Sequence, residues 1–178
     1  MTGCDRAHGR GEVYQRRAVL LLTCGLLLAG CRPAPPPLTH TFGSPEELAS
    51  AVLDGLSRSD AEGLAALALS ENEFRHHVWP ALPVSRPERN MPFEYVWKDL
   101  QAKSRAHLAA KLADPALRRL TAGSVVFDGE TTEYSGFAVM RKARLQVRDA
   151  AGESGSLRVF GSVLRKDGRY KLFSYVVD

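Results

Sequence analysis

The chain contains very little cysteine. Of its 178 residues only Cys4, Cys24 and Cys31 are cysteines, so no thiol occurs after position 31. This excludes a disulfide framework, a cysteine nucleophile, a redox motif and a zinc–cysteine site from everything downstream. Long hydrophobic runs are scarce as well. The apolar run at 18–29 is 12 residues long, which is too short to span a bilayer as a permanent helix.

Charge of one sign is also lacking. The chain carries 24 basic and 20 acidic side chains, and four arginines and two acids lie in residues 1–30, so the remainder has a net charge of only +2. This near balance argues against nucleic acid as a partner. Basic residues do gather at 141–148 and at 165–171. Solvated strand faces and turns are the expected role, and contact with an anionic lipid or cell-wall polymer is the alternative.

The first 31 residues have the order of a secretory signal. Arginines at 6, 10, 16 and 17 precede the apolar run, and the segment closes with Leu-Ala-Gly-Cys at 28–31. Basic flank, short apolar stretch and small residues are the three parts of a signal peptide. The closing tetrapeptide resembles the lipobox of bacterial lipoproteins. This resemblance implies cleavage between Gly30 and Cys31 and attachment of a diacylglyceryl group to the Cys31 thiol.

The lipobox predicts where the protein works. Two or three acyl chains, palmitate among them, anchor a protein stably, whereas one chain does so only marginally. We therefore expect a cell-envelope protein held to a membrane through Cys31. By analogy with Gram-negative sorting, a residue other than aspartate after the lipidated cysteine favours the outer membrane, facing the periplasm, and here that residue is Arg32. The alternatives are an ordinary secretory signal or an uncleaved anchor.

Three parts follow from this interpretation: a signal peptide (1–30), a lipidated tether (31–43) and a single domain (44–178). The tether has prolines at 33, 35, 36 and 37 and shows no apolar periodicity. At ~3.1 Å per residue, an extended polyproline conformation could hold the domain roughly 30–35 Å from the membrane. No internal repeat and no second linker divide the remainder.

The first half of the domain is predicted to be helical. Capping-box patterns occur at 44–47, 59–62 and 70–73, each followed by apolar residues at helical spacing. Helical periodicity returns from Pro92 to Ala113, and Asp114-Pro115 ends it. The four predicted helices cover most of residues 44–113.

After Pro115 the apolar period changes to two, which is typical of strands. We expect strands at 120–127, 137–148, 157–163 and 170–177, a short returning segment at 131–134, and turns at 128–129, 149–152 and 166–168. The turn at 128–129 (Asp-Gly) predicts a hairpin. Helices followed by a meander predict an α+β fold. Its N-terminal helices would pack on a curved antiparallel sheet of about four to five strands.

This order resembles the nuclear-transport-factor-two-like (cystatin-like) superfamily. The resemblance rests on Ser-Arg-Ser-Asp at 57–60 between two short helices, a further helix, and a meander ending in Asp-Gly-Arg-Tyr-Lys-Leu at 167–172. It implies a cone with an internal pocket. The long helix at 92–113 departs from the superfamily pattern. Segments 73–80 and 160–163 also resemble a group of bacterial lipoproteins with no activity attached.

Residues that could carry chemistry are few. Glu73 shares a helix face with His76 and His77, but a metal site needs a further ligand and none is evident, so no metal or cofactor is expected. Enzymes of the superfamily, of isomerase or cyclase type, use a buried carboxylate or histidine beside a tyrosine. Asp99, Tyr95 and Tyr134 are the available types, and a solvated acid and core-edge tyrosines are the simpler interpretation.

Aromatic residues suggest a binding role instead. Trp79, Tyr95, Trp97 and Tyr134 are candidates for the wall of a ligand pocket, and a packed core is the alternative. The last strand, 170–177, is apolar on both faces, so helices, a second subunit or an envelope protein should cover it. We therefore expect a membrane-anchored, non-catalytic binding or assembly module. A small isomerase- or cyclase-like enzyme is the alternative.

Overall fold

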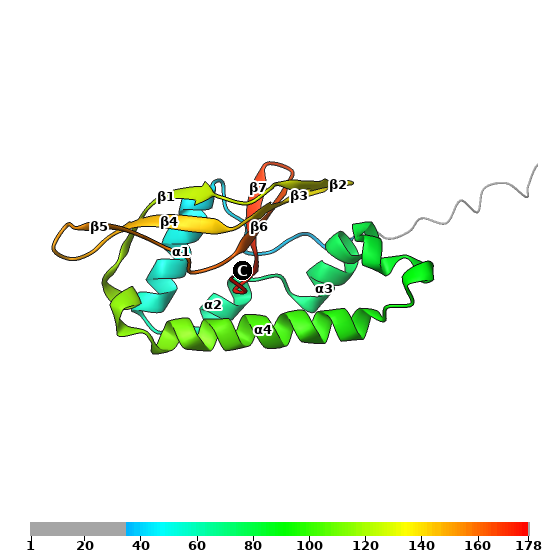
Figure 1. Ribbon diagram of the computed structural model, residues 1–178, viewed down its shortest axis with the longest axis horizontal. Coiled ribbons are helices and arrows are strands. Elements are labelled where there is room, and N and C mark those ends of the chain that lie inside the picture. Colours follow the sequence, from blue (N-terminus) through cyan, green and yellow to red (C-terminus); the bar gives the residue numbers. More distant parts are fainter. Residues whose placement is uncertain (1–34, 178) are drawn as a thin grey trace, which may run out of the picture. The chain divides into compact units, whose positions relative to one another are not determined.

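The computed structural model describes residues 35–177, in which helices precede two antiparallel sheets (Figure 1). The helices are α1 (Pro45–Ser57), α2 (Ala61–Leu67), α3 (Glu71–Glu73), the π-helix η1 (Phe74–Val78), the 3₁₀ turns η2 (Trp79–Ala81), η3 (Pro83–Ser85) and η4 (Pro87–Arg89), α4 (Phe93–Ala113), and the 3₁₀ turn η5 (Pro115–Arg119). The strands are β1 (Thr121–Phe127), β2 (Thr132–Tyr134), β3 (Phe137–Arg141), β4 (Ala143–Arg148), β5 (Ser154–Leu157), β6 (Ser162–Lys166) and β7 (Arg169–Ser174). The predicted α+β class is confirmed.

Local side chains cap the starts of α1, α2 and α3, although not always as predicted. The Ser44 hydroxyl accepts from the Glu47 N–H at the start of α1. At α2 the cap is Asp60, whose carboxylate accepts from the Gly63 N–H at 2.9 Å. The predicted capping box on Ser59 is wrong, because Ser59 has φ 55° and belongs to the preceding turn. Only α3 begins with a complete reciprocal box.

The strands form two sheets, with orders β1–β4–β5 and β2–β3–β6–β7. The predicted hairpin at 128–129 is wrong, because β1 pairs with β4 and β2 pairs with β3. The predicted strand over 137–148 is broken at Lys142, whose φ of 54° ends the pleat. From there β4 leaves β3 and joins the other sheet. The predicted strand over 157–163 is also wrong, because β5 ends at Leu157 and β6 begins only at Ser162. These two breaks raise the strand count to seven, compared with the expected four to five.

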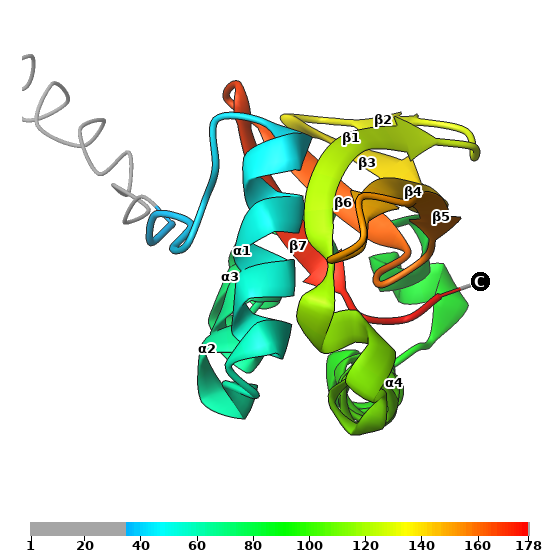
Figure 2. The ribbon, with the colours of Figure 1, turned by 90° about the vertical axis from the view of Figure 1, so that its left-hand side faces the viewer.

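Two apolar clusters form the interior. The first lies between α1 and the strands and contains the predicted stripe of α1, Leu48, Val52 and Leu56, all at most 1 % exposed. Figure 2 shows α1 lying alongside β1. The second cluster joins Leu69, η1 and the start of α4 to β3 and β6. It contains Phe74, Phe93 and Trp97, whose rings pack 5.5–5.9 Å apart on Phe74.

The chain itself covers the outer edge of β7. Phe42 pairs with Tyr170 through two backbone hydrogen bonds, and the Leu69 N–H donates to the Leu172 carbonyl at 3.0 Å. These contacts satisfy an edge that would otherwise attract another strand. Leu172 and Tyr175 are also buried by the first cluster. Packing within the chain therefore buries Leu172 and Tyr175, whereas Tyr170, Phe173 and Val176 are only partly buried.

Residues 36–42 of the predicted tether are part of this domain. The Pro36 carbonyl accepts from His77, Leu38 packs against the second cluster, and Arg169 donates to the Thr41 carbonyl at 2.6 Å. Residues 36–42 of the predicted 31–43 tether are therefore not a free linker. The signal peptide, Gly30 and Cys31 lie outside the described residues. Within residues 35–177, no helix combines the length and the apolar character needed to cross a membrane.

Candidate functional site

The first candidate site is built around Glu73, at the end of α3. Its backbone N–H donates to the Ser70 hydroxyl, which caps the helix. Its carboxylate turns back to accept from the Ser70 N–H at 2.8 Å and from the Ser70 hydroxyl at 2.9 Å. This capping box points the carboxylate inward, where the side chain is only 4 % exposed. A local helix-start motif thus delivers a charge to the interior.

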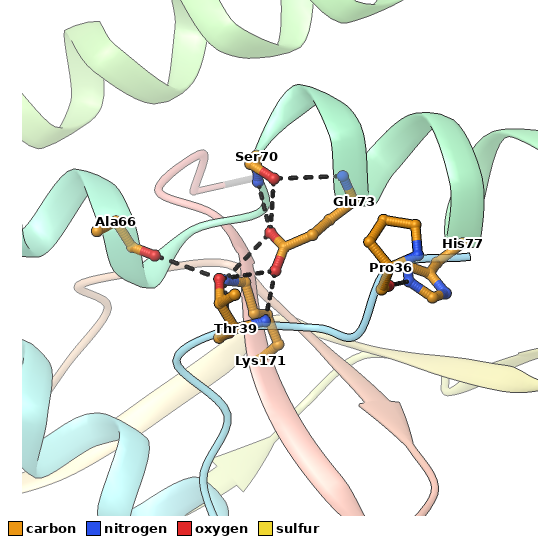
Figure 3. A network of polar contacts seen from close by, with 7 residues as sticks. All are labelled: Pro36, Thr39, Ala66, Ser70, Glu73, His77 and Lys171. Carbon is orange, nitrogen blue, oxygen red and sulfur yellow. Dashed lines mark hydrogen bonds and ion pairs between the residues drawn. The ribbon is translucent and has the colours of Figure 1, made fainter. Parts of the chain in front are cut away.

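Lys171 of β7 meets this carboxylate (Figure 3). Its ammonium lies 3.3 Å from Oε2 of Glu73, with the lysine side chain only 1 % exposed. The same ammonium donates to the carbonyls of Thr39 at 2.8 Å and Ala66 at 3.5 Å. Three acceptors match the three hydrogens of an ammonium group. The buried cation is therefore fully satisfied.

Thr39 completes the network from the N-terminal segment. Its N–H and its hydroxyl both donate to Oε1 of Glu73, at 2.7 and 3.0 Å. Glu73 thus accepts from two donors on Ser70, two on Thr39 and one on Lys171 (Figure 3). We call these four residues the buried clasp. It joins the N-terminal segment, the cap of α3 and the last strand.

The clasp keeps Glu73 ionised. Burial by itself raises the pKa of this carboxyl, but the backbone hydrogen bonds from Ser70 and Thr39 and the charge of Lys171 together hold it below its ordinary value. Burial lowers the pKa of Lys171, and the charge and hydrogen bond of Glu73 partly oppose that shift. The pKa of the Glu73 carboxyl is therefore shifted away from neutrality, the direction opposite to that required of a catalytic carboxylic acid.

Tyr175 is the other buried polar side chain of interest. Its hydroxyl donates to the Leu64 carbonyl at 2.7 Å, and burial raises its pKa. The donor that an oxyanion would require is thus already engaged. Its backbone N–H donates to the Ser104 hydroxyl of α4 at 3.0 Å. Tyr175 therefore ties the end of the chain to α2 and α4.

The histidines beside Glu73 have separate partners. His76 Nδ1 lies 2.8 Å from the Asn72 carbonyl, and His77 Nε2 lies 2.6 Å from the Pro36 carbonyl. Glu73 itself is committed to the clasp and not to either histidine. Within the described part of the chain, no three histidine, cysteine or acidic side chains gather as a metal site would require.

A second candidate site is a groove of about 320 Å³ between α4 and the strands. Alternation along β3 places Arg141 on the same face as Phe137 and Val139 of the second cluster. The groove is therefore the open end of that cluster, where the apolar floor gives way to an exposed guanidinium. Its lining residues are Phe74, Leu82, Val96, Asp99, Leu100, Lys103, Arg141, Ser162, Phe173, Ser174 and Val176.

The four predicted pocket residues do not line one cavity, which corrects the expectation of a shared pocket wall. Trp79 and Trp97 belong to or pack on the second cluster, although Trp97 also lines a cavity of about 120 Å³ beneath α4. Tyr134 stacks on Phe137 with ring centres 4.9 Å apart. Tyr95 points outward and is 66 % exposed. The packed-core alternative describes three of them.

Asp99, considered as a possible base, is a solvated helical acid. It pairs with Lys103 one turn further along α4, at 2.8 Å, and both side chains are at least half exposed. The expectation that the basic residues at 165–171 are solvated is wrong for Lys171, which is 0 % exposed, and sequence reasoning gave Thr39 no role. A lysine between Tyr170 and Leu172, in an otherwise apolar strand, was the available signal. It gave no indication of the partner.

Comparison with known proteins gives no relative: no family model, no curated protein and no solved structure matches this chain.

Proposed function

We propose that this chain is a membrane-anchored envelope lipoprotein whose domain acts as a non-catalytic binding or assembly module. The observation that carries the proposal is the buried clasp. It uses the buried ion pair of the domain to hold Thr39, eight residues after the predicted lipidation site Cys31. The charged pair binds the N-terminal segment, which is the side of the predicted lipid anchor. This structural role favours a binding or assembly module over a catalyst.

The clasp also supports a fixed orientation for the anchored domain. A flexible tether would allow the domain to turn freely about its lipid. Here residues 36–42 are held by His77, Glu73, Lys171 and Arg169, so the chain leaves the domain at one defined place. The domain would present the same surfaces to the membrane and to the surrounding envelope.

The isomerase- or cyclase-like alternative gains no support from these contacts. It requires a buried carboxylate or histidine beside a tyrosine whose hydroxyl is available to an oxyanion. Glu73 accepts five hydrogen bonds or ionic contacts, and the Tyr175 hydroxyl donates to Leu64. The groove beside Arg141 is the better candidate for a bound ligand. A partner contact through residues 170–177 stays a prediction.

Lipidation is tested by substitution of Cys31. We expect the wild-type protein to incorporate labelled palmitate and to float with membranes on a sucrose gradient. Cys31→Ser should abolish the label and release the protein from the membrane fraction. Cys24→Ser, within the predicted signal peptide, is the matched control and should retain both properties. An unlabelled wild-type protein, or an uncleaved precursor in the cytosol, would refute the proposal.

A further inference from the structure

The chain enters the domain at a defined point, close to the predicted lipid. The Pro36 carbonyl is held by His77 of η1 at 2.6 Å, and Pro36 follows Cys31 by five residues. At the ~3.3–3.6 Å per residue of a fully extended chain, this separation can span at most roughly 16–18 Å. The surface around η1 must therefore stay close to any membrane that holds Cys31.

The start of α4 lies at this same end of the domain. Arg75 of η1 lies 3.6 Å from the Glu94 carboxylate and its guanidinium sits 3.6 Å above the Phe93 ring. Trp79 packs edge-on against Phe93, with ring centres 5.4 Å apart. Figure 1 shows α3, the turns that follow it and the first turns of α4 gathered at one end.

This end carries amphipathic side chains that face outward. Tyr95 is 66 % exposed and Met91 is 38 % exposed. The third large hydrophobic residue exposed among residues 35–177 is Val126 of β1, so two of the three lie within five residues of each other at the start of α4. Tyrosine is enriched at membrane–water interfaces, because its ring is apolar and its hydroxyl is polar.

Exposed charges surround these two residues. Residues 86–98 carry three basic and two acidic exposed side chains: Arg86, Arg89, Lys98, Glu88 and Glu94. Glu94 is already close to Arg75 at 3.6 Å, which leaves the basic side chains in excess. Basic residues near a bilayer are attracted to anionic lipid head groups over about one Debye length, ~8–10 Å.

We propose that residues 86–98, the exit-end surface, rest on the head-group layer of the membrane that holds the acylated Cys31. Tyr95 and Met91 enter the interface while the basic side chains meet anionic lipid. The few residues between Cys31 and Pro36 keep this surface at high effective concentration beside the bilayer. The small apolar area of Tyr95 and Met91 is therefore sufficient for membrane contact. The inference rests on the proposed lipid anchor and adds which face of the domain lies on the membrane.

Two single-cysteine variants test it. The processed chain has no cysteine besides Cys31, whose thiol is blocked by acylation, so Tyr95→Cys and Val126→Cys each provide one labelling position. Both native side chains are exposed, and Val126, 40 % exposed on β1, is the matched control. The lipidated proteins are labelled with a nitrobenzoxadiazole fluorophore and reconstituted in phosphatidylethanolamine–phosphatidylglycerol vesicles that contain nitroxide-labelled lipid.

We expect the nitroxide lipid to quench the fluorophore at position 95 at least threefold more than the fluorophore at position 126. Substituting Arg86, Arg89 and Lys98 by glutamate should reduce the quenching at position 95. Protein that floats with vesicles but is quenched equally at both positions would overturn this inference and leave the anchor intact. Such a result would favour a protein or cell-wall partner for the surface. Protein that fails to float would overturn the proposed anchor, and this inference with it.

Discussion

Breaking the buried clasp should destabilise the domain far more than its short list of contacts suggests. Glu73→Gln keeps the size of the side chain and one carbonyl oxygen but removes the charge 3.3 Å from the Lys171 ammonium. That ammonium would stay buried with two backbone acceptors and without a negative charge beside it. Removing one partner of a buried ion pair costs about 3–5 kcal/mol. We expect a loss of this size in the free energy of unfolding.

The partner substitution should cost less. Lys171→Met leaves the Glu73 carboxylate with four hydrogen-bond donors from Ser70 and Thr39, so the remaining charge is still solvated by the protein. The double variant lacks both charges, so no buried charge remains without its partner. We therefore expect the double variant to be less destabilised than the sum of the single variants by about 0.5–3 kcal/mol, the range seen for residues in one network.

Urea unfolding of the chain from position 31, with Cys31→Ser, measures these values through Trp79 and Trp97, which lie in or against the second cluster. The control is the Asp99–Lys103 pair, which is closer at 2.8 Å but exposed. Exposed pairs contribute little, so its coupling should be close to zero. Equal coupling in the two pairs would refute the argument that burial, and not separation, gives the clasp its strength.

Three further predictions concern the same fold. Gly161→Ala should destabilise the domain by about 1–3 kcal/mol, because its Cβ would overlap the Val176 carbonyl oxygen, whereas Gly155→Ala, with its nearest neighbour at 3.8 Å, should be nearly neutral in urea unfolding. Ser70→Ala should cost about 1–2 kcal/mol by removing the α3 cap, measured from the thermal midpoint. In acid, the contribution of Glu73 is complete above its ordinary pKa of 4.5 and is lost as pH falls through its lowered folded-state pKa, so the wild type should lose more stability than Glu73→Gln when titrated from pH 6 to pH 2.

Each of these predictions has a result that contradicts it. A Gly161→Ala protein as stable as Gly155→Ala would mean that the backbone at Val176 moves away from position 161 at little cost. An unchanged thermal midpoint in Ser70→Ala would show that the capping box stabilises the start of α3 no more than water does. Parallel acid profiles for wild type and Glu73→Gln would show that the carboxyl titrates in the folded protein as it does in the unfolded chain.

Local patterns predicted the helices well. The α1 stripe of Leu48, Val52 and Leu56 and the capping box at Ser70 depend on residues three or four positions apart, and both are confirmed. The strand pairing was harder to anticipate. Asp-Gly at 128–129 satisfies the composition of a hairpin, yet the backbone there pairs with Arg141 and Lys142. Turn composition reports local backbone preference and carries no information about distant partners.

The candidate sites show the same limit. Helical spacing separates Trp97, which lies on the apolar stripe with Phe93 and is 7 % exposed, from Tyr95, which lies off it and is 66 % exposed. Placing both in one pocket wall rested on their aromatic character alone. Lys171 is a more instructive case. Burial of a lysine is favourable only when acceptors surround it, and its acceptors come from Thr39, Ala66 and Glu73. They lie 132, 105 and 98 positions away in the sequence.

By itself the sequence indicated the helices and the change to a period of two, and it predicts a leader that ends at Gly30, because all of these depend on neighbours within a few residues. Only the tertiary structure decided that β4 joins β1 and that residues 36–42 fasten to Glu73 and Lys171. Strand register and the pairing of buried charges depend on which distant groups meet in the folded chain. A pattern of neighbouring residues does not specify which distant groups come into contact.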